Sequence, residues 1–260
     1  MSDGVEALIE VEILCHRNVA TVERTPCAVF LHNLQLSGYH GANRALLLRD
    51  DGRGAGEVAK TVVHYYRVRG MSPVADVDPV AEQQGIGAAL RRLRVLPVAH
   101  HVLLMSYGAG MLPEMPSGPI AIERVPRETG RGEAREWVEL VASEEAGTAH
   151  AALWRTVIAT EARGAGRTQY LARIGGRAAG ACSLFVAQQR GRIDDVFVLP
   201  EWRRRGVATA LVTWAVRDAL ECGCKQVYLF AEEGGPAVTL YRKLGFEVLA
   251  RDFLRRHIAS

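Results

Sequence analysis

The segment at residues 198–211, VLPEWRRRGVATAL, places three arginines and a glycine directly before an apolar run at helical spacing. A helix start carries unpaired backbone N–H groups and a partial positive charge, so it can bind an anion. Gly206 has no side chain and would let a phosphate approach the backbone closely. Arg203, Arg204 and Arg205 would add positive charge around it. The segment therefore predicts a polyphosphate site at a helix N-terminus, and the alternative is an ordinary strand–loop–helix connection that carries arginines.

The residues before this loop predict a strand with an unpaired edge. Residues 195–198, DVFV, have strand character, and Pro200 cannot donate to a ladder, so pairing should end there. A strand that loses its neighbour leaves N–H and C=O groups with which a ligand carrying amides could pair. Coenzyme A, which has a diphosphate and two amides along its arm, fits both features.

The composition is that of a globular protein with a substantial core. The chain has 260 residues, of which 48% are hydrophobic and 23% charged, and its net charge is +3. One large domain or two small ones is expected at this length. The weak charge does not favour a nucleic-acid binder, and five scattered cysteines do not suggest a disulfide framework.

The N-terminus lacks a signal-peptide pattern, and no apolar run is long enough to span a bilayer. We therefore expect a cytoplasmic protein.

Hydrophobic periodicity predicts a regular series of elements in the second half of the chain. A stretch at 108–118, rich in glycine, proline and methionine, is typical of a linker. After it, strands are expected at 120–125, 170–174, 178–187, 193–198, 227–231 and 246–253. Helices are expected at 133–143, 149–162, 206–222 and 236–244.

The first half gives a weaker pattern. Strands are expected at 28–34, 44–48, 74–77 and 102–105, and helices at 56–68 and 86–93.

Residues 119–256 resemble the GNAT acetyltransferase superfamily. Arg203-x-x-Gly206-x-Ala208 follows Val198-x-Pro200, and a helix, a strand and LYRKLGF (240–246) come next in the family's order. The resemblance implies an α+β fold, with a mixed, mostly antiparallel sheet whose central strands are splayed and flanked by helices.

The resemblance also implies acetyl-CoA as co-substrate, bound between splayed parallel strands at 194–198 and 227–231. In the family, backbone N–H groups of the Arg-x-x-Gly-x-Ala segment hold the pyrophosphate, and the preceding strand pairs with the pantetheine arm. The cofactor-binding residues implied here are Phe197, Val198, Arg203, Arg204, Arg205, Gly206, Val207, Ala208 and Thr209.

Tyr241 lies where the family commonly has a tyrosine that protonates the departing thiolate. A phenol suits this role because its O–H can donate while staying protonated at neutral pH. An ordinary core tyrosine on an amphipathic helix is the alternative. Many family members carry an asparagine seven residues earlier, and here that position is Gly234.

Asp194 and Asp195 are the candidates for a base that accepts the proton of the acceptor amine. They are adjacent on a predicted strand, so they should point to opposite faces. Family members with a base on this strand tend to have it in phase with Val196 and Val198, which favours Asp194. The alternative is that one aspartate makes a structural hydrogen bond and the other is solvated.

In the first half, YYRVRGM (65–71) leading into SPVADVDP (72–79) resembles the degenerate first half of tandem GNAT proteins. This resemblance predicts a degenerate domain at 1–118 and a catalytic domain at 119–260. VDPVAEQQGIGAAL (77–90) looks like a second copy of the motif, but Glu82 replaces the arginine and would repel a pyrophosphate. Coincidence or an inactive copy is favoured. Gly52-x-Gly54-x-Gly56 lacks the ending of a phosphate loop and is interpreted as a flexible turn.

The expected function is acetyl-CoA-dependent N-acetylation of a small-molecule amine, without a metal and with no nucleic-acid or membrane partner. A monomer or a homodimer is expected. A protein or peptide acceptor, or a non-catalytic acyl-CoA-binding module, are the alternatives. Glu232 and Glu233, after the strand at 227–231, could hold a cationic acceptor or form a solvated loop.

Overall fold

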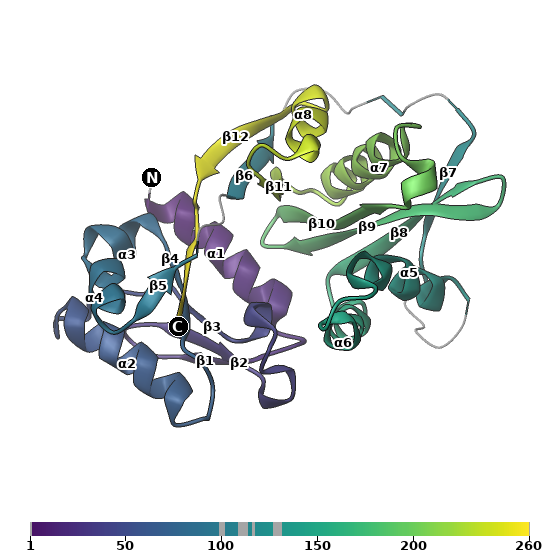
Figure 1. The fold of residues 1–260 in the computed structure, drawn as a ribbon. Coiled ribbons are helices and arrows are strands. Elements are labelled where there is room, and N and C mark those ends of the chain that lie inside the picture. The colour runs from purple at the N-terminus through teal and green to yellow at the C-terminus, as the bar shows by residue number, and fades with distance from the viewer. Residues whose placement is uncertain (1, 99–101, 109–113, 116–117, 127–131, 260) are drawn as a thin grey trace. The chain divides into compact units, whose positions relative to one another are not determined.

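The computed structural model describes residues 2–98, 102–108, 114–115, 118–126 and 132–259, and Figure 1 shows their fold. The chain forms two compact units. Unit 1 comprises Met1–His101 and Asp252–Ser260, and unit 2 comprises Val102–Arg251. Most of the predicted linker at 108–118 lies outside the described residues. In the described part of the chain, no helix has the length and hydropathy needed to cross a bilayer.

Unit 2 is built on a seven-stranded sheet in the order β12-β6-β11-β10-β9-β8-β7. Its strands are β6 (Val102–Tyr107), β7 (Ile120–Arg124), β8 (Arg167–Ile174), β9 (Arg177–Ala187), β10 (Arg190–Val198), β11 (Gln226–Glu232) and β12 (Phe246–Arg251). Its helices are α5 (Glu133–Ala142), η3 (Ser143–Glu145), α6 (Ala151–Glu161), η4 (Pro200–Trp202), α7 (Val207–Glu221) and α8 (Pro236–Lys243). All pairings in this sheet are antiparallel except that of β10 with β11. The predicted mixed, mostly antiparallel sheet is confirmed.

The two parallel strands β10 and β11 separate part of the way along their length. Their pairing ends with Arg192 opposite Tyr228, although β10 continues to Val198 and β11 to Glu232. The splayed central strands are therefore confirmed. Beyond this point each strand has a stretch of edge that does not pair with the other.

Helices cover both faces of the unit 2 sheet. Cys182 of β9 packs in a cluster with Leu211 of α7, whereas its neighbour Ala181 packs with Trp137 of α5. Adjacent residues of a strand point to opposite faces, so α7 and α5 lie on opposite sides. The indole N–H of Trp137 donates to the carbonyl of Cys182 (3.1 Å), which fixes α5 on the sheet.

Unit 1 is built on a six-stranded mixed sheet in the order β1-β2-β3-β4-β13-β5. Its strands are β1 (Thr21–Arg24), β2 (Val29–His32), β3 (Arg44–Leu46), β4 (Val74–Val77), β5 (Val95–Pro97) and β13 (Arg255–Ala259). Its helices are α1 (Ser2–His16), η1 (Leu34–Leu36), η2 (His40–Ala42), α2 (Ala55–Arg67), α3 (Pro79–Gln83) and α4 (Ile86–Arg92). The elements α1, β1, β5 and β13 were not expected from the sequence pattern.

Each sheet contains one strand that directly follows, in sequence, a strand of the other unit. β6 follows β5 in sequence but lies between β11 and β12, and β13 follows β12 but lies between β4 and β5. The strand predicted at 246–253 is therefore interrupted near Asp252, which has a positive φ of 46°. The predicted domain bounds at 118 and 119 do not follow the compact units, and the assignment of these domains to functions stays a prediction.

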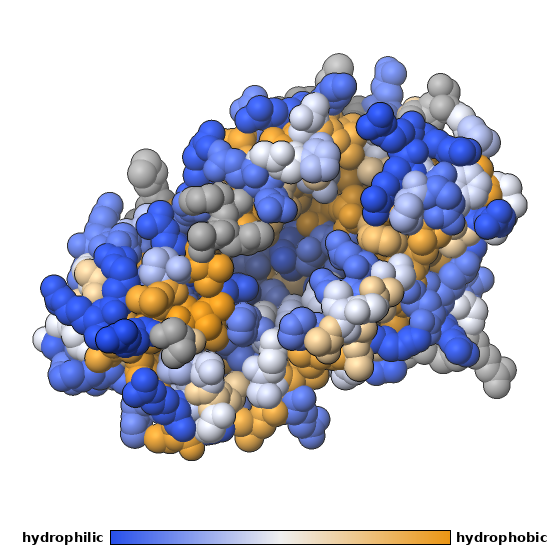
Figure 2. Space-filling model, viewed as in Figure 1, coloured by the Kyte–Doolittle hydropathy of each residue, from blue (hydrophilic) through white to orange (hydrophobic). Residues whose placement is uncertain are grey.

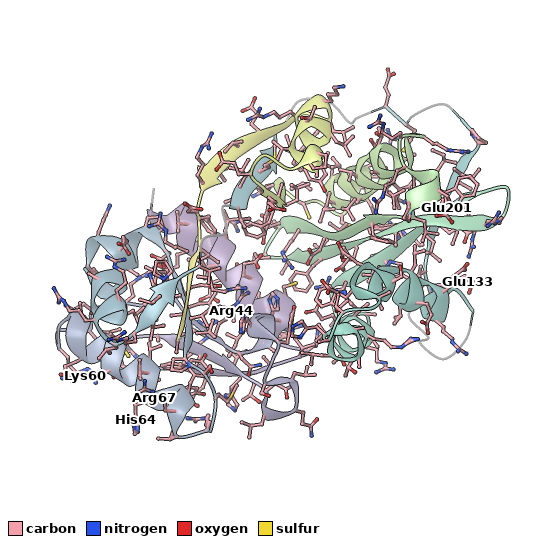
Figure 3. The ribbon with its side chains drawn as sticks, in the orientation of Figure 1. Arg44, Lys60, His64, Arg67, Glu133 and Glu201 are labelled. Atoms are coloured by element: carbon pink, nitrogen blue, oxygen red, sulfur yellow. The ribbon has the colours of Figure 1, made fainter. Side chains whose placement is uncertain are left out.

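A buried charge network fixes β13 in unit 1. Asp76 of β4 is 1% exposed and accepts from Arg44 Nη1 (2.9 Å) and from Arg256 Nε of β13 (2.8 Å). Burial by itself would raise the pKa of Asp76, but the charges of the two arginines outweigh it and lower that pKa. Figure 3 shows Arg44 in the interior of unit 1, in contrast to Lys60 and Arg67 on the outer side of α2.

Candidate active site

The loop between β10 and α7 presents backbone N–H groups at a helix start. Arg204 and Gly206 both have positive φ, 65° and 84°, and Gly206 caps α7 without a side-chain hydrogen bond. The N–H of Ala210 donates to the carbonyl of Gly206 (2.9 Å), so the N–H groups of residues 207–209 have no acceptor within the helix. Left-handed residues in a turn before a helix can direct backbone N–H groups to one side, which makes an anion-binding concavity.

A cavity of about 680 Å³ joins this loop to the end of β10, beyond its last pairing with β11. It is lined by the end of β10, η4, the loop, the first turn of α7, one side of α8, and η3. Of the predicted site residues, those that line it are Phe197, Val198, Arg203, Arg204, Gly206, Val207, Ala208, Thr209 and Tyr241. Asp194 and Arg205 do not line it. Figure 2 shows hydrophobic side chains gathered around α7 and α8, near this cavity.

Tyr241 on α8 faces this cavity and is 6% exposed. Its ring packs against Phe246, with 5.9 Å between the ring centroids. Burial, with contributions from Cys182 and Asp194, raises the pKa of Tyr241 to about 12. The phenol is therefore protonated at neutral pH and can donate a hydrogen bond or a proton into the cavity.

The regular alternation expected for the strand around Asp194 and Asp195 is wrong, because β10 contains a β-bulge. Asp194 lies opposite Ser183, but Phe197 lies opposite Ala181, so β10 has one residue more than β9 over this stretch. Asp195 takes the unusual conformation, with φ of 54°.

The bulge changes which residues share a face with Asp194. Because Ser183 and Ala181 are two positions apart on β9, Asp194 is in phase with Phe197. Val196 and Val198 pack instead in the cluster on the α7 side, whereas Phe197 packs on the α5 side. The phase argument that favoured Asp194 over Asp195 therefore fails, and the base stays a prediction.

Asp194 is part of a partly exposed charged group close to the cavity. Its Oδ2 lies 2.7 Å from Nη1 of Arg192, and its side chain is 34% exposed. Glu144 of η3 lines the cavity, and burial, followed by the charges of Glu145 and Asp194, raises the pKa of Glu144. Glu144 was missed by sequence reasoning, since tertiary packing alone brings η3 to the end of β10.

Asp195 is held inside unit 2 and does not line the cavity. Its Oδ2 accepts from Ser183 Oγ (2.6 Å) and from Arg167 Nη1 (3.2 Å), and Arg167 also lies 3.5 Å from Glu161. Burial raises the pKa of Asp195, as do the charges of Asp194 and Glu161, whereas Arg167 opposes the rise. These contacts fix the bulge.

The acidic pair after β11 has structural partners. The carbonyl of Glu232 accepts from the N–H of Gly235 (3.0 Å), and the carboxylate of Glu233 forms an ion pair with Arg251. The ion pair engages the carboxylate of Glu233, whereas the side chain of Glu232 is exposed, so the two interpretations of the pair stay predictions. Gly234, which follows Glu233, has a positive φ of 81°.

The comparisons agree with this geometry. The sequence model of the acetyltransferase (GNAT) family matches residues 133–246. An N-alpha-acetyltransferase, MAK3 of Arabidopsis thaliana, is 43% identical over 58 residues, which are 22% of this chain and 30% of that protein. The chain spans less than a third of the length of the curated relatives it matches.

Two solved structures share the fold of most of the chain. A GCN5-related N-acetyltransferase from Kribbella flavida has a TM-score of 0.68 at 16% identity, covering 98% of this chain and 93% of that one. A tandem GNAT protein from the clavulanic acid biosynthesis pathway has a TM-score of 0.59 at 17% identity, covering 83% and 72%. Residues 133–246, which carry the loop before α7 and Tyr241, are therefore similar to the acetyltransferase (GNAT) family.

Proposed function

We propose that unit 2 transfers the acetyl group of acetyl-CoA to the primary amine of a small-molecule acceptor. The observation that carries this proposal is the single cavity of about 680 Å³, which joins an anion-binding helix start, an unpaired strand edge and a buried phenol. The match of residues 133–246 to the GNAT family model supports acetyl-CoA as the co-substrate.

The chain offers a matching group for each part of the cofactor. Backbone N–H groups of residues 207–209 and the guanidinium groups of Arg203 and Arg204 suit the pyrophosphate. The edge of β10 at Phe197 and Val198, beyond the last pairing with β11, suits the amides of the pantetheine arm. The acetyl thioester would then lie toward Tyr241.

The transfer step needs one bond to form and one to break. The neutral amine attacks the thioester carbonyl, a C–N bond forms, and the C–S bond breaks with its electron pair leaving on sulfur. Tyr241 donates its proton to this thiolate, and the ammonium proton passes to a base. We assign the base to Asp194, acting through water because it does not line the cavity.

A protein or peptide acceptor is the second candidate. The similarity of residues in this chain to an N-alpha-acetyltransferase favours it, although the similar segment is 30% of that relative. A non-catalytic acyl-CoA-binding module is the third, and the protonated buried phenol in the cavity argues against it.

Two measurements separate these candidates. Calorimetric titration with acetyl-CoA tests the cofactor, and a thiol-release assay with a panel of diamines, amino sugars and short peptides tests the acceptor. We expect acetyl-CoA to bind and a small amine to release thiol. Release with peptides alone would establish the second candidate, and binding without release from any amine would establish the third. Absence of acetyl-CoA binding would overturn the proposal.

A further inference from the structure

Two arginines converge on one tryptophan at the edge of the cavity. Trp202 on η4 lines the cavity and packs on the hydrophobic core of unit 2. The guanidinium carbon of Arg205 lies 5.2 Å from the centroid of its ring, and that of Arg177 lies 5.8 Å away. These distances are in the range of cation–π attraction, so the ring holds two cationic groups near one another.

Neither guanidinium is neutralised by a neighbour. Within the described residues, neither Arg177 nor Arg205 forms an ion pair with a carboxylate, and both side chains are exposed. Glu201, labelled in Figure 3, lies on the same turn as Trp202, is exposed, and pairs with neither arginine in the described chain. A guanidinium stacked on a ring still directs its N–H groups outward in its own plane, so both can bind an anion.

The position of this group follows from the strand register. Val198 lies opposite Gly180, and the N–H of Leu199 donates to the carbonyl of Ala179 (3.1 Å). Arg177 therefore begins β9 just past the end of β10, beside η4. Trp202 precedes the anion-binding loop in sequence, and Tyr241 faces the cavity from the separate helix α8. An acyl-CoA laid along β10 with its thioester toward Tyr241 would thus bring its nucleotide end to Trp202.

We infer that Arg177 and Arg205, held by Trp202, bind the 3′-phosphate on the ribose of CoA. This inference rests on the proposed function, because it takes acetyl-CoA as the ligand. A phosphate monoester carries nearly two negative charges at neutral pH and three strong acceptor oxygens, which suit planar guanidinium donors. The site distinguishes acetyl-CoA from 3′-dephospho-acetyl-CoA, which has the same pyrophosphate, pantetheine and thioester.

The test is calorimetric titration of the full chain with acetyl-CoA and with 3′-dephospho-acetyl-CoA. We expect the wild type to bind acetyl-CoA about 10-fold to 100-fold more tightly, the amount given by one or two charge-assisted hydrogen bonds. The double variant Arg177→Ala with Arg205→Ala should bind both ligands with the weaker affinity. Arg135→Ala, which removes an exposed arginine of α5 outside the cavity, should keep the preference.

The outcomes separate this inference from the proposed function. If neither ligand binds the wild type, the proposed function fails. If both bind equally well, or if the double variant keeps the full preference, the 3′-phosphate site is overturned while the proposed function stands. Trp202→Phe keeps a ring for the arginines, so it should retain most of the preference, and a melting curve establishes that each variant is folded.

Discussion

The two units contain a similar series of strands and helices, but the loops before α7 in unit 2 and before α2 in unit 1 differ in sequence. In unit 2 the series β10-α7-β11-α8-β12 has β10 and β11 parallel, and in unit 1 the series β3-α2-β4-α4-β5 has β3 and β4 parallel. Gly54 caps α2 with φ of 88°, as Gly206 caps α7 with φ of 84°. β6 lies between β11 and β12 in unit 2, and β13 lies in the corresponding place between β4 and β5 in unit 1.

The chemistry of the two loops differs. In unit 1, Oδ1 of Asp50 accepts from the N–H groups of Gly52 (3.0 Å) and Gly54 (2.8 Å), so a carboxylate of the chain takes up the donors of that loop. In unit 2 the loop carries three arginines and opens on the cavity. Two loops at corresponding places in the two units therefore differ in charge: one is bound by a carboxylate of the chain and the other is rich in arginine.

This comparison also corrects the interpretation of two glycine motifs. Gly52-x-Gly54-x-Gly56 is not just a flexible turn, because Gly54 caps α2 and its N–H is bound by Asp50. The segment at 77–90 follows β4, which corresponds to β11 and not to β10, so its likeness to the motif is local. Gly85 nevertheless caps α4 with φ of 77°.

The same comparison extends to the second motif. α8 ends at a cap residue, Leu244, followed by Gly245 with φ of 91°, and α4 ends at Leu93, followed by Arg94 with φ of 62°. Aligning these ends places the fully buried Leu90 where unit 2 has Tyr241. Unit 1 therefore has no phenol at this position.

The largest expected effect comes from making unit 2 resemble unit 1 at Tyr241. Tyr241→Phe removes the donor and leaves the ring against Phe246, so turnover should fall about 10²-fold to 10⁴-fold if the phenol is the general acid. Steady-state kinetics measure this, and titration should show nearly unchanged acetyl-CoA affinity. Tyr228→Phe, on β11 outside the cavity, is the matched control. Unimpaired turnover would leave water as the proton donor.

A carboxylate can also be introduced into the open loop. Gly206→Glu should weaken acetyl-CoA binding by about 100-fold or more, because it places a negative charge against the pyrophosphate. Calorimetry measures the change. Gly206→Ala gives the cost of a side chain at positive φ without the charge, and Gly54→Glu, where an added Cβ meets open space, should leave binding unchanged. Normal binding by a folded Gly206→Glu variant would place the anion site elsewhere.

The comparison can also be tested in unit 1, by removing the carboxylate of Asp50 that binds its loop. Asp50→Ala leaves two N–H groups without their acceptor and should lower the free energy of unfolding by about 1 kcal/mol. Titration should give one acetyl-CoA per chain in the wild type and in this variant, since the arginines of this loop in unit 1, Arg49 and Arg53, pair with aspartates and the unit lacks the phenol. Two acetyl-CoA molecules per chain in the wild type would show that unit 1 is also a working site.

The last expected effect contrasts the buried carboxylates of the two units. Two arginines lower the pKa of Asp76, whereas burial raises that of Asp195 above its ordinary 3.8. A raised pKa means that the folded state binds the proton more tightly than the unfolded state, so Asp195 contributes increasing stability as pH falls from neutral.

The change that isolates this contribution is Asp195→Asn, which cannot titrate. The stability advantage of the wild type over this variant should grow by no more than about 1.4 kcal/mol per pH unit between pH 7 and pH 5. Chemical unfolding at several pH values measures it. A difference that is independent of pH, or that shrinks toward acid pH, would contradict a raised pKa.

The sequence by itself determined the features that depend on neighbouring residues. A glycine before an apolar helical repeat predicts the start of α7, and alternation predicts β9 and β11, because both patterns follow from local backbone geometry. The family motif then placed Tyr241 and the loop arginines. Nine of the eleven predicted site residues line one cavity.

The tertiary structure alone decided which strands pair and where the irregularities fall. Strand exchange by β6 and β13 depends on partners more than a hundred residues away, such as Asp76 for Arg256, which no local pattern encodes. The bulge at Asp195 depends on the buried contacts of Ser183 and Arg167, and it reset the phase of Asp194. Hydrophobic periodicity fixes the face that a residue presents, but register and strand partners are set by packing between distant segments.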